Sequence, residues 1–133
     1  MIGTVVVCHG KIGLEMVRIA QSIVRDASPM VAVSIEHDED VNRTRHKISD
    51  AIREVQQEGG VLLMTDMFGG TPSNLCLSFL EGKKVEVIAG VNLPMLIKLA
   101  SYKEDKPLAE VATFIQNYGQ KNIALAGKIL EGS

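Results

Sequence analysis

Short apolar runs alternate along the chain with longer segments whose apolar residues recur every three or four positions. The short runs are rich in β-branched residues and predict strands, and the first is typical of a strand buried on both faces of a sheet. Four strands are predicted at Gly3–Cys8, Val31–Ile35, Val61–Thr65 and Lys84–Ala89, with Ile123–Ala126 as a candidate for a fifth.

The segments between these runs have helical periodicity. The first helix is predicted from Ile12 to about Ala27, with a core-facing stripe made of Ile12, Met16, Ile19, Ala20 and Ile23. The second has its apolar face at Ile48, Ala51, Ile52 and Val55. A short helix is expected from Thr71 to about Leu80, because Thr71 followed by Pro72 is typical of an N-cap and a first helical position.

Two more helices are predicted near the C-terminal end. One leads from the turn Gly90–Pro94, with Asn92 as a cap, to about Ser101. The other starts at Pro107 and ends near Tyr118, with Gly119 in the C-terminal capping position.

Alternating strands and helices predict right-handed crossovers and a mainly parallel sheet covered on both faces, which is an α/β three-layer sandwich. The common strand order 2-1-3-4 would make the first and third strands neighbours. With 133 residues, of which 46% are hydrophobic, the sequence is enough for one core, so we expect a single domain over residues 1–133.

Two polar residues directly follow strands that this order makes neighbours. His9 follows the first strand and precedes Gly10, while Asp66 follows the third strand. Ligands gather at the carboxyl ends of parallel strands, so the two side chains are predicted to meet there. A carboxylate bonded to one ring nitrogen would leave the other free to attack phosphorus. The alternatives are a structural histidine bonded to the backbone and an aspartate that caps its own turn.

The segment Asp66–Asn74 joins a strand to a helix N-terminus, where free N–H groups favour an anion. A phosphoryl group on His9 would be cradled there, and the candidate phosphate-binding residues are Gly10, Gly69, Gly70 and Thr71. Neither GxGxxG nor GxxxxGK[ST] occurs, so this is not a nucleotide-binding loop. A plain capped turn explains Gly-Gly-Thr-Pro about as well, and only the combination with His9 is informative.

Four apolar residues near the predicted site are candidates for docking a protein partner. Met67 and Phe68 lie in the loop after Asp66, and Leu93 and Met95 follow the fourth strand. Core or loop packing is the competing interpretation for all four.

Composition excludes several functional classes. A net charge of −2 with interspersed signs argues against nucleic acid, and no apolar stretch is long enough to span a bilayer, so membrane association would come through a partner. Cys8 and Cys76 have no metal-ligand or redox spacing, and the dense acidic loop around His37 is interpreted as solvated, so no metal or cofactor is expected. Without a signal peptide, the expected location is the cytoplasm.

The spacing of His9-Gly10, Asp66–Asn74 and Gly90–Met95 resembles the mannose-type A-domains (EIIA) of the bacterial sugar phosphotransferase system over nearly the whole chain. The resemblance implies that His9 accepts a phosphoryl group from the histidine-containing phosphocarrier protein and passes it to a B component. It also implies that Asp66 orients His9, that Thr71 contacts phosphate, and that a homodimer forms in which the C-terminal strand, antiparallel at the sheet edge, is exchanged between partners.

The chain departs from this family in two respects. Met67 and Phe68 stand where a hydroxyl residue and tryptophan are frequent, and no B-domain follows, so a separate B component of a permease is expected. Two alternative functions stay open: a regulatory module whose phosphorylation is sensed without onward transfer, and the phosphotransfer subunit of dihydroxyacetone kinase. The Phe-Gly-Gly-Thr-Pro loop favours the mannose branch over the kinase subunit.

Overall fold

A four-stranded parallel sheet forms the centre of the molecule in the computed structural model, which describes residues 1–132. Its strands are β1 (Gly3–His9), β2 (Met30–Ile35), β3 (Val61–Thr65) and β4 (Val85–Ala89). Their order is β2-β1-β3-β4, as predicted, and all three pairings are parallel. In this register His9 pairs with Ile35, and Val7 pairs with Thr65. The carboxyl ends of β1, β2 and β3 therefore lie together at one edge.

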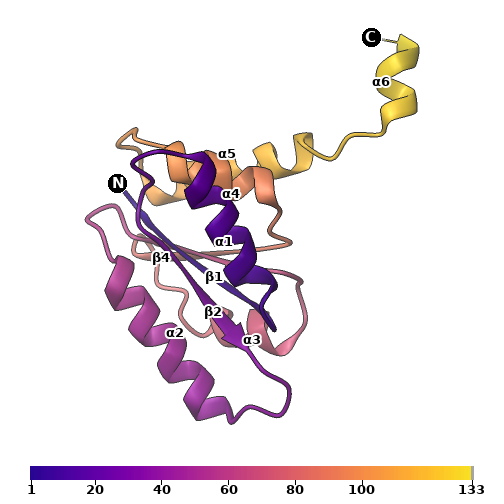
Figure 1. Cartoon of the computed structure of the whole chain (residues 1–133). Helices are drawn as coiled ribbons and strands as arrows, with labels where there is room; N and C mark the ends of the chain where they lie inside the picture. Colours follow the sequence, from indigo (N-terminus) through magenta and orange to yellow (C-terminus); the bar gives the residue numbers. More distant parts are fainter. Residues whose placement is uncertain (133) are drawn as a thin grey trace.

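Helices cover both faces of the sheet (Figure 1), so the predicted three-layer α/β sandwich is confirmed. The helices are α1 (Ile12–Ile23), α2 (Val41–Val55), α3 (Thr71–Leu77), α4 (Leu93–Ser101), α5 (Leu108–Lys121) and α6 (Ala126–Gly132). Helices α1, α4 and α5 pack on one face against Val6, Leu62 and Met64. Helices α2 and α3 pack on the other face against Val5 and Leu63, because successive side chains of a strand point to opposite faces.

Helix α1 is present, but the predicted core stripe is wrong at three of its positions. Its buried residues are Gly13, Val17 and Ala20, whereas Ile12, Ile19 and Ile23 are exposed. The close approach of α1 to β1 explains the rotation: a Cβ on Gly13 would lie 3.1 Å from Cys8 Sγ. A glycine at this position lets this turn of the helix lie close against the strand, and Ile12, Ile19 and Ile23 then lie away from the sheet.

Two predicted helix caps are also wrong. Gly70, not Thr71, is the N-cap of α3, and Ser73 from the first turn accepts a hydrogen bond from the Gly69 N–H and donates one to the Gly70 carbonyl. Gly119 lies inside α5 instead of ending it, and Met95 packs so closely against it that a Cβ would lie 2.4 Å from Met95 Sδ. The Asn92 cap of α4 is confirmed, with the side chain accepting a hydrogen bond from the Met95 N–H.

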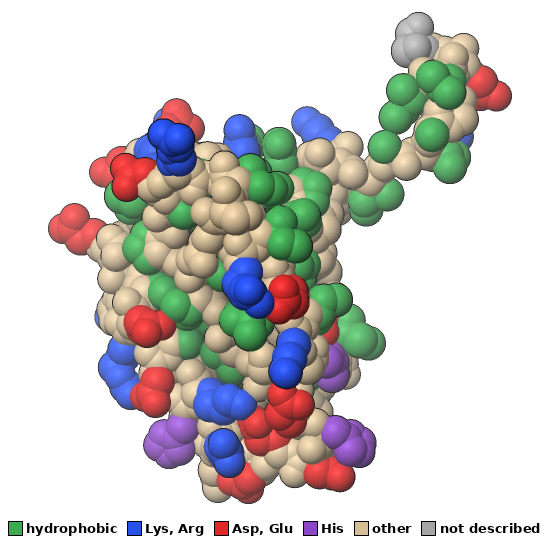
Figure 2. Space-filling view, viewed as in Figure 1, with side chains coloured by type: hydrophobic (Ala, Val, Ile, Leu, Met, Phe, Trp, Pro, Cys, Tyr) green, Lys and Arg blue, Asp and Glu red, His purple; other side chains and the backbone are tan. Residues whose placement is uncertain are grey.

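The predicted fifth strand does not form within the single chain. Residues 123–125 have no regular secondary structure, and α6 extends away from the body with no buried residue (Figures 1 and 2). Within the described residues β3 is the only strand that pairs with β4, and a single antiparallel bridge joins Val85 to Glu81, so the outer edge of β4 is open beyond Val85. In residues 1–132, we find no helix with the length and apolar character that crossing a membrane requires.

Candidate functional site

His9 and Asp66 contact each other at the carboxyl edge of the sheet. The Asp66 Oδ2 atom lies 2.9 Å from His9 Nδ1 and accepts a second hydrogen bond, of 3.0 Å, from the His9 backbone N–H. Adjacent strands place them: β1 ends at His9, and Asp66 is the residue after β3. This geometry confirms the prediction, made from the strand order, that the two side chains contact each other.

This contact determines which ring nitrogen of His9 is available. A carboxylate is only an acceptor, so His9 Nδ1 bears the hydrogen and the lone pair of Nε2 is free. His9 is 51% exposed, whereas Asp66 is only 20% exposed. A Cβ on Gly70 would lie 3.6 Å from Nε2 and 3.3 Å from Cε1, so the absence of a side chain there keeps the ring accessible.

The Asp66 carboxylate is held ionised by its neighbour. Burial raises the pKa of this carboxyl, but the backbone and ring hydrogen bonds from His9 outweigh burial, and the pKa lies below its ordinary value. Its second oxygen, Oδ1, is buried and has no hydrogen-bond partner in the described part of the chain. Both hydrogen bonds that His9 donates to this carboxylate go to Oδ2, so His9 is its main hydrogen-bond partner among the described residues.

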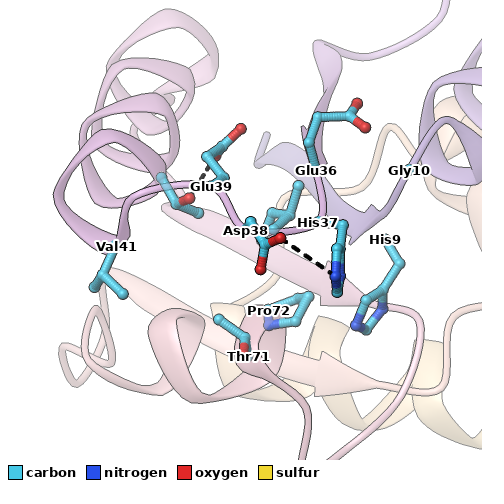
Figure 3. Close-up of a pocket in the computed structure, with 11 residues that line it drawn as sticks. His9, Gly10, Glu36, His37, Asp38, Glu39, Val41, Thr71 and Pro72 are labelled. Carbon is cyan, nitrogen blue, oxygen red and sulfur yellow. Dashed lines mark hydrogen bonds and ion pairs between the residues drawn. The ribbon is translucent and has the colours of Figure 1, made fainter.

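A hollow of about 620 Å³ opens beside the His9 ring (Figure 3). Its lining comes from the ends of β1 and β2, the loop that follows β2, and the starts of α2 and α3: His9, Gly10, Ile35, Glu36, His37, Asp38, Glu39, Val41, Thr44, Thr71 and Pro72. The exposed Nε2 of His9 therefore has space for a tetrahedral anion and for part of a protein partner.

The candidate phosphate-binding residues take different places around this hollow. Gly10 and Thr71 line it, while Gly70 flanks the ring. Gly69 is exposed, has a φ of 92°, and its N–H already donates to Ser73 Oγ at 2.8 Å. Its position in the left-handed region favours glycine and lets the chain turn into α3.

The loop 36–40 forms one wall of the hollow, a role that sequence reasoning missed. Its acidic composition is typical of a solvated loop, but Glu39 is only 7% exposed and pairs with Lys47 at 2.8 Å. Thr44 donates a second hydrogen bond to the Glu39 carboxylate, and Lys47 also donates to the Ser34 carbonyl. The hydrogen bonds from Lys47 and then Thr44 lower the pKa of Glu39. Its position after β2, the neighbour of β1, was the available indication that this loop reaches the site.

The four apolar candidates for partner docking do not share one environment. Met67 and Phe68 are exposed in the loop after Asp66, and Leu93 is half-buried at the start of α4. Met95 is only 3% exposed because it packs against Gly119 of α5. The docking prediction is therefore wrong for Met95, which belongs to the core.

Neither cysteine is part of the site. Both are fully buried, and burial, with a smaller effect of the Asp66 charge on Cys8 and of Cys8 on Cys76, raises the pKa of each thiol to about 12. Residues 1–132 contain no group of three or more histidine, cysteine or acidic side chains arranged to hold a metal ion.

Comparison with known proteins identifies the family of this chain. The family model EIIA-man, described as "PTS system fructose IIA component", matches residues 3–116. The chain belongs to the EIIA-man family. It is a component of a mannose- or fructose-type phosphotransferase system, which takes part in sugar transport.

Individual relatives extend the likeness over most of the chain. The fructose-specific EIIA component of Bacillus subtilis is 27% identical over 132 residues, which cover 98% of this chain and 90% of that protein. The mannose-specific EIIAB component of Escherichia coli is 26% identical over 133 residues, but these cover only 41% of its length. The mannose/sorbose-specific IIA subunit from Enterococcus faecalis superimposes with a TM-score of 0.80 at 25% identity, and the match covers 92% of each chain.

Proposed function

We propose that the chain is a phosphocarrier in which His9 Nε2 accepts a phosphoryl group from the histidine-containing phosphocarrier protein. The observation that carries this proposal is the 2.9 Å contact between Asp66 Oδ2 and His9 Nδ1, which leaves Nε2 as the exposed nucleophile. Asp66 is the positioning residue, and Gly10, Gly70 and Thr71 surround the place where the phosphoryl group would lie.

The transfer needs no redox partner. The Nε2 lone pair forms the new N–P bond while the P–N bond of the donor histidine breaks and its electron pair returns to the donor ring. Because the hydrogen stays on Nδ1, the phosphorylated His9 ring becomes cationic, and the Asp66 carboxylate stabilises that charge. The reverse sequence, with a B component as acceptor, passes the phosphoryl group onward.

Onward transfer to a B component is the fate favoured by the family match. The Escherichia coli relative is named an EIIAB component, and this chain aligns with less than half of it. We assign the acceptor role to a B component in the cytoplasm, and membrane contact to the permease partners of that component. Neither a purely regulatory module nor a dihydroxyacetone kinase subunit is favoured by these relatives.

A homodimer is the second part of the proposal. The outer edge of β4 is open beyond Val85, and two hollows lie beside it where β4 faces α5. Ile123 and Leu125 are exposed in the segment that follows α5. We propose that this segment pairs, antiparallel, with β4 of a second copy, which would satisfy the open edge and bury both side chains.

The phosphocarrier proposal is tested by intact-mass measurement after incubation with phosphoenolpyruvate, the general phosphotransferase enzyme and its phosphocarrier protein. Wild type is expected to gain one acid-labile phosphoryl group, and His9→Ala is expected to gain none. The control His46→Ala, which changes an exposed residue of α2, is expected to gain one. Equal phosphorylation of His9→Ala and wild type, or no phosphorylation of wild type, overturns the proposal.

A further inference from the structure

A second histidine lies in the wall of the hollow beside His9. His37 is on the loop 36–40, is 96% exposed, and its Nε2 lies 3.5 Å from Asp38 Oδ2. Figure 3 shows the rings of His37 and His9 both directed into the hollow, near Thr71 and Pro72. The phosphotransfer scheme above gives His37 no role.

The loop that bears His37 is anchored on both sides of this residue. The Ile35 carbonyl accepts a hydrogen bond from the Gly10 N–H, which joins the ends of β1 and β2. On the other side, the buried Glu39 pairs with Lys47, and its N–H donates to the Glu36 carbonyl across a turn in which Asp38 has a φ of 63°. The position of His37 at the hollow is therefore determined by the fold, although its side chain is open to solvent.

The charged side chains that line the hollow are mostly acidic. Its lining includes Glu36, Asp38 and Glu39 from the loop and His9 from β1, while the starts of α2 and α3 contribute no charged group. Lys47 is already paired with Glu39. A phosphoryl group on His9 would add negative charge to an acidic wall, and of the lining residues only His37 can supply a further positive charge near neutral pH.

We propose that protonated His37 donates a hydrogen bond to a phosphoryl oxygen of phosphorylated His9. This rests on the proposed function and adds a phosphoryl-binding residue to it. Protonation of His37 stabilises the phosphorylated state, and its deprotonation restores the repulsion by Glu36 and Asp38 and favours transfer to the acceptor. The balance between holding and releasing the phosphoryl group thus depends on the protonation state of the His37 side chain.

The test compares wild type, His37→Gln and the matched control His46→Gln, whose altered residue is exposed on α2 outside the hollow. The equilibrium of phosphoryl transfer with the phosphocarrier protein is measured between pH 5.5 and 8.5, with the modified residue located by mass spectrometry. Near pH 6 we expect His37→Gln to hold the phosphoryl group about threefold to tenfold less than wild type, as loss of a charge-assisted hydrogen bond at an exposed site implies. The difference should disappear near pH 8, and His46→Gln should follow wild type.

The possible outcomes separate the two proposals. If wild type and His37→Gln are both phosphorylated on His9 with the same pH profile, the role of His37 is wrong and the phosphocarrier function stands. If His46→Gln changes the profile as much as His37→Gln, the effect is one of general charge, and the role of His37 is again wrong. If wild type gains no phosphoryl group on His9, both proposals fail.

Discussion

At the scale of single residues, the proposed function depends on the hydrogen bond between Asp66 and one ring nitrogen of His9. One carboxylate oxygen accepts both the His9 backbone N–H and the Nδ1 hydrogen, while the other has no partner among the described residues. Such a carboxylate determines the ring orientation and the tautomer together. Strand order and the two strand ends were enough to predict this pair, because parallel neighbours bring their carboxyl ends together.

Asp66→Asn should slow phosphorylation of His9 by roughly 100-fold, since the amide no longer determines the tautomer or stabilises the cationic ring. Rapid-quench mass spectrometry of phosphoryl transfer from the phosphocarrier protein measures this rate. Asp50→Asn, which alters an exposed residue on α2, is the control and should match wild type. A rate for Asp66→Asn within twofold of wild type would contradict the positioning role.

The Glu39–Lys47 pair gives a prediction for acid stability. The folded-state pKa of Glu39 is lowered, so its charge contributes stability above the pKa of the unfolded state, and this contribution is lost as pH falls through the folded pKa. Glu39→Gln should therefore be less stable than wild type at pH 7, and the difference should shrink below about pH 4. Urea unfolding at several pH values measures this, with the exposed Glu54→Gln as control. A pH-independent difference would show that the charge of Glu39 is not the cause.

At the scale of elements, the strands were easier to predict than the faces of the helices. All four strands lie within one residue of the predicted bounds, since compact β-branched runs have few other ways to be buried. For α1 the helical periodicity was predicted correctly, but the buried face was not. The close contact of Gly13 with Cys8 determines that face, and a glycine adds nothing to the hydrophobic pattern of the sequence. The acidic wall of the site was missed for a similar reason: only the fold shows that Glu39 is buried.

The orientation of α1 is tested by two truncations on the same helix. Val17→Ala removes fully packed methyl groups and should cost about 2 kcal/mol of unfolding free energy. Ile23→Ala removes an exposed side chain and should cost less than about 0.5 kcal/mol. Chemical denaturation of both variants measures the difference, and a larger loss for Ile23→Ala would restore the stripe inferred from the sequence.

At the scale of the whole molecule, two features point to a second copy of the chain. One is the outer edge of β4 beyond Val85, and the other is residues 123–125, where Ile123 and Leu125 are exposed. A strand was predicted there, but a strand needs the edge of a sheet to pair with. The sequence pattern does not say whether that edge belongs to the same copy of the chain or to a second copy. Pairing between two copies answers both requirements at once.

Sedimentation of the full chain at micromolar concentration should therefore show a dimer. Leu125→Pro should shift it toward the monomer, because proline cannot donate to a strand ladder. Lys128→Ala, in the same C-terminal region but outside the pairing segment, should remain dimeric. A wild-type monomer at every concentration, or a dimer unchanged by Leu125→Pro, would contradict strand exchange.

In the proposed mechanism, Asp66 accepts a hydrogen bond from Nδ1 of His9, and Nε2 receives the phosphoryl group. Nuclear magnetic resonance of the phosphorylated protein, with ¹⁵N-labelled histidine and ³¹P detection, identifies the phosphorylated nitrogen directly. We predict coupling of phosphorus to Nε2 of His9, with a hydrogen retained on Nδ1. Phosphorus on Nδ1, or on His37 or His46, would contradict the account.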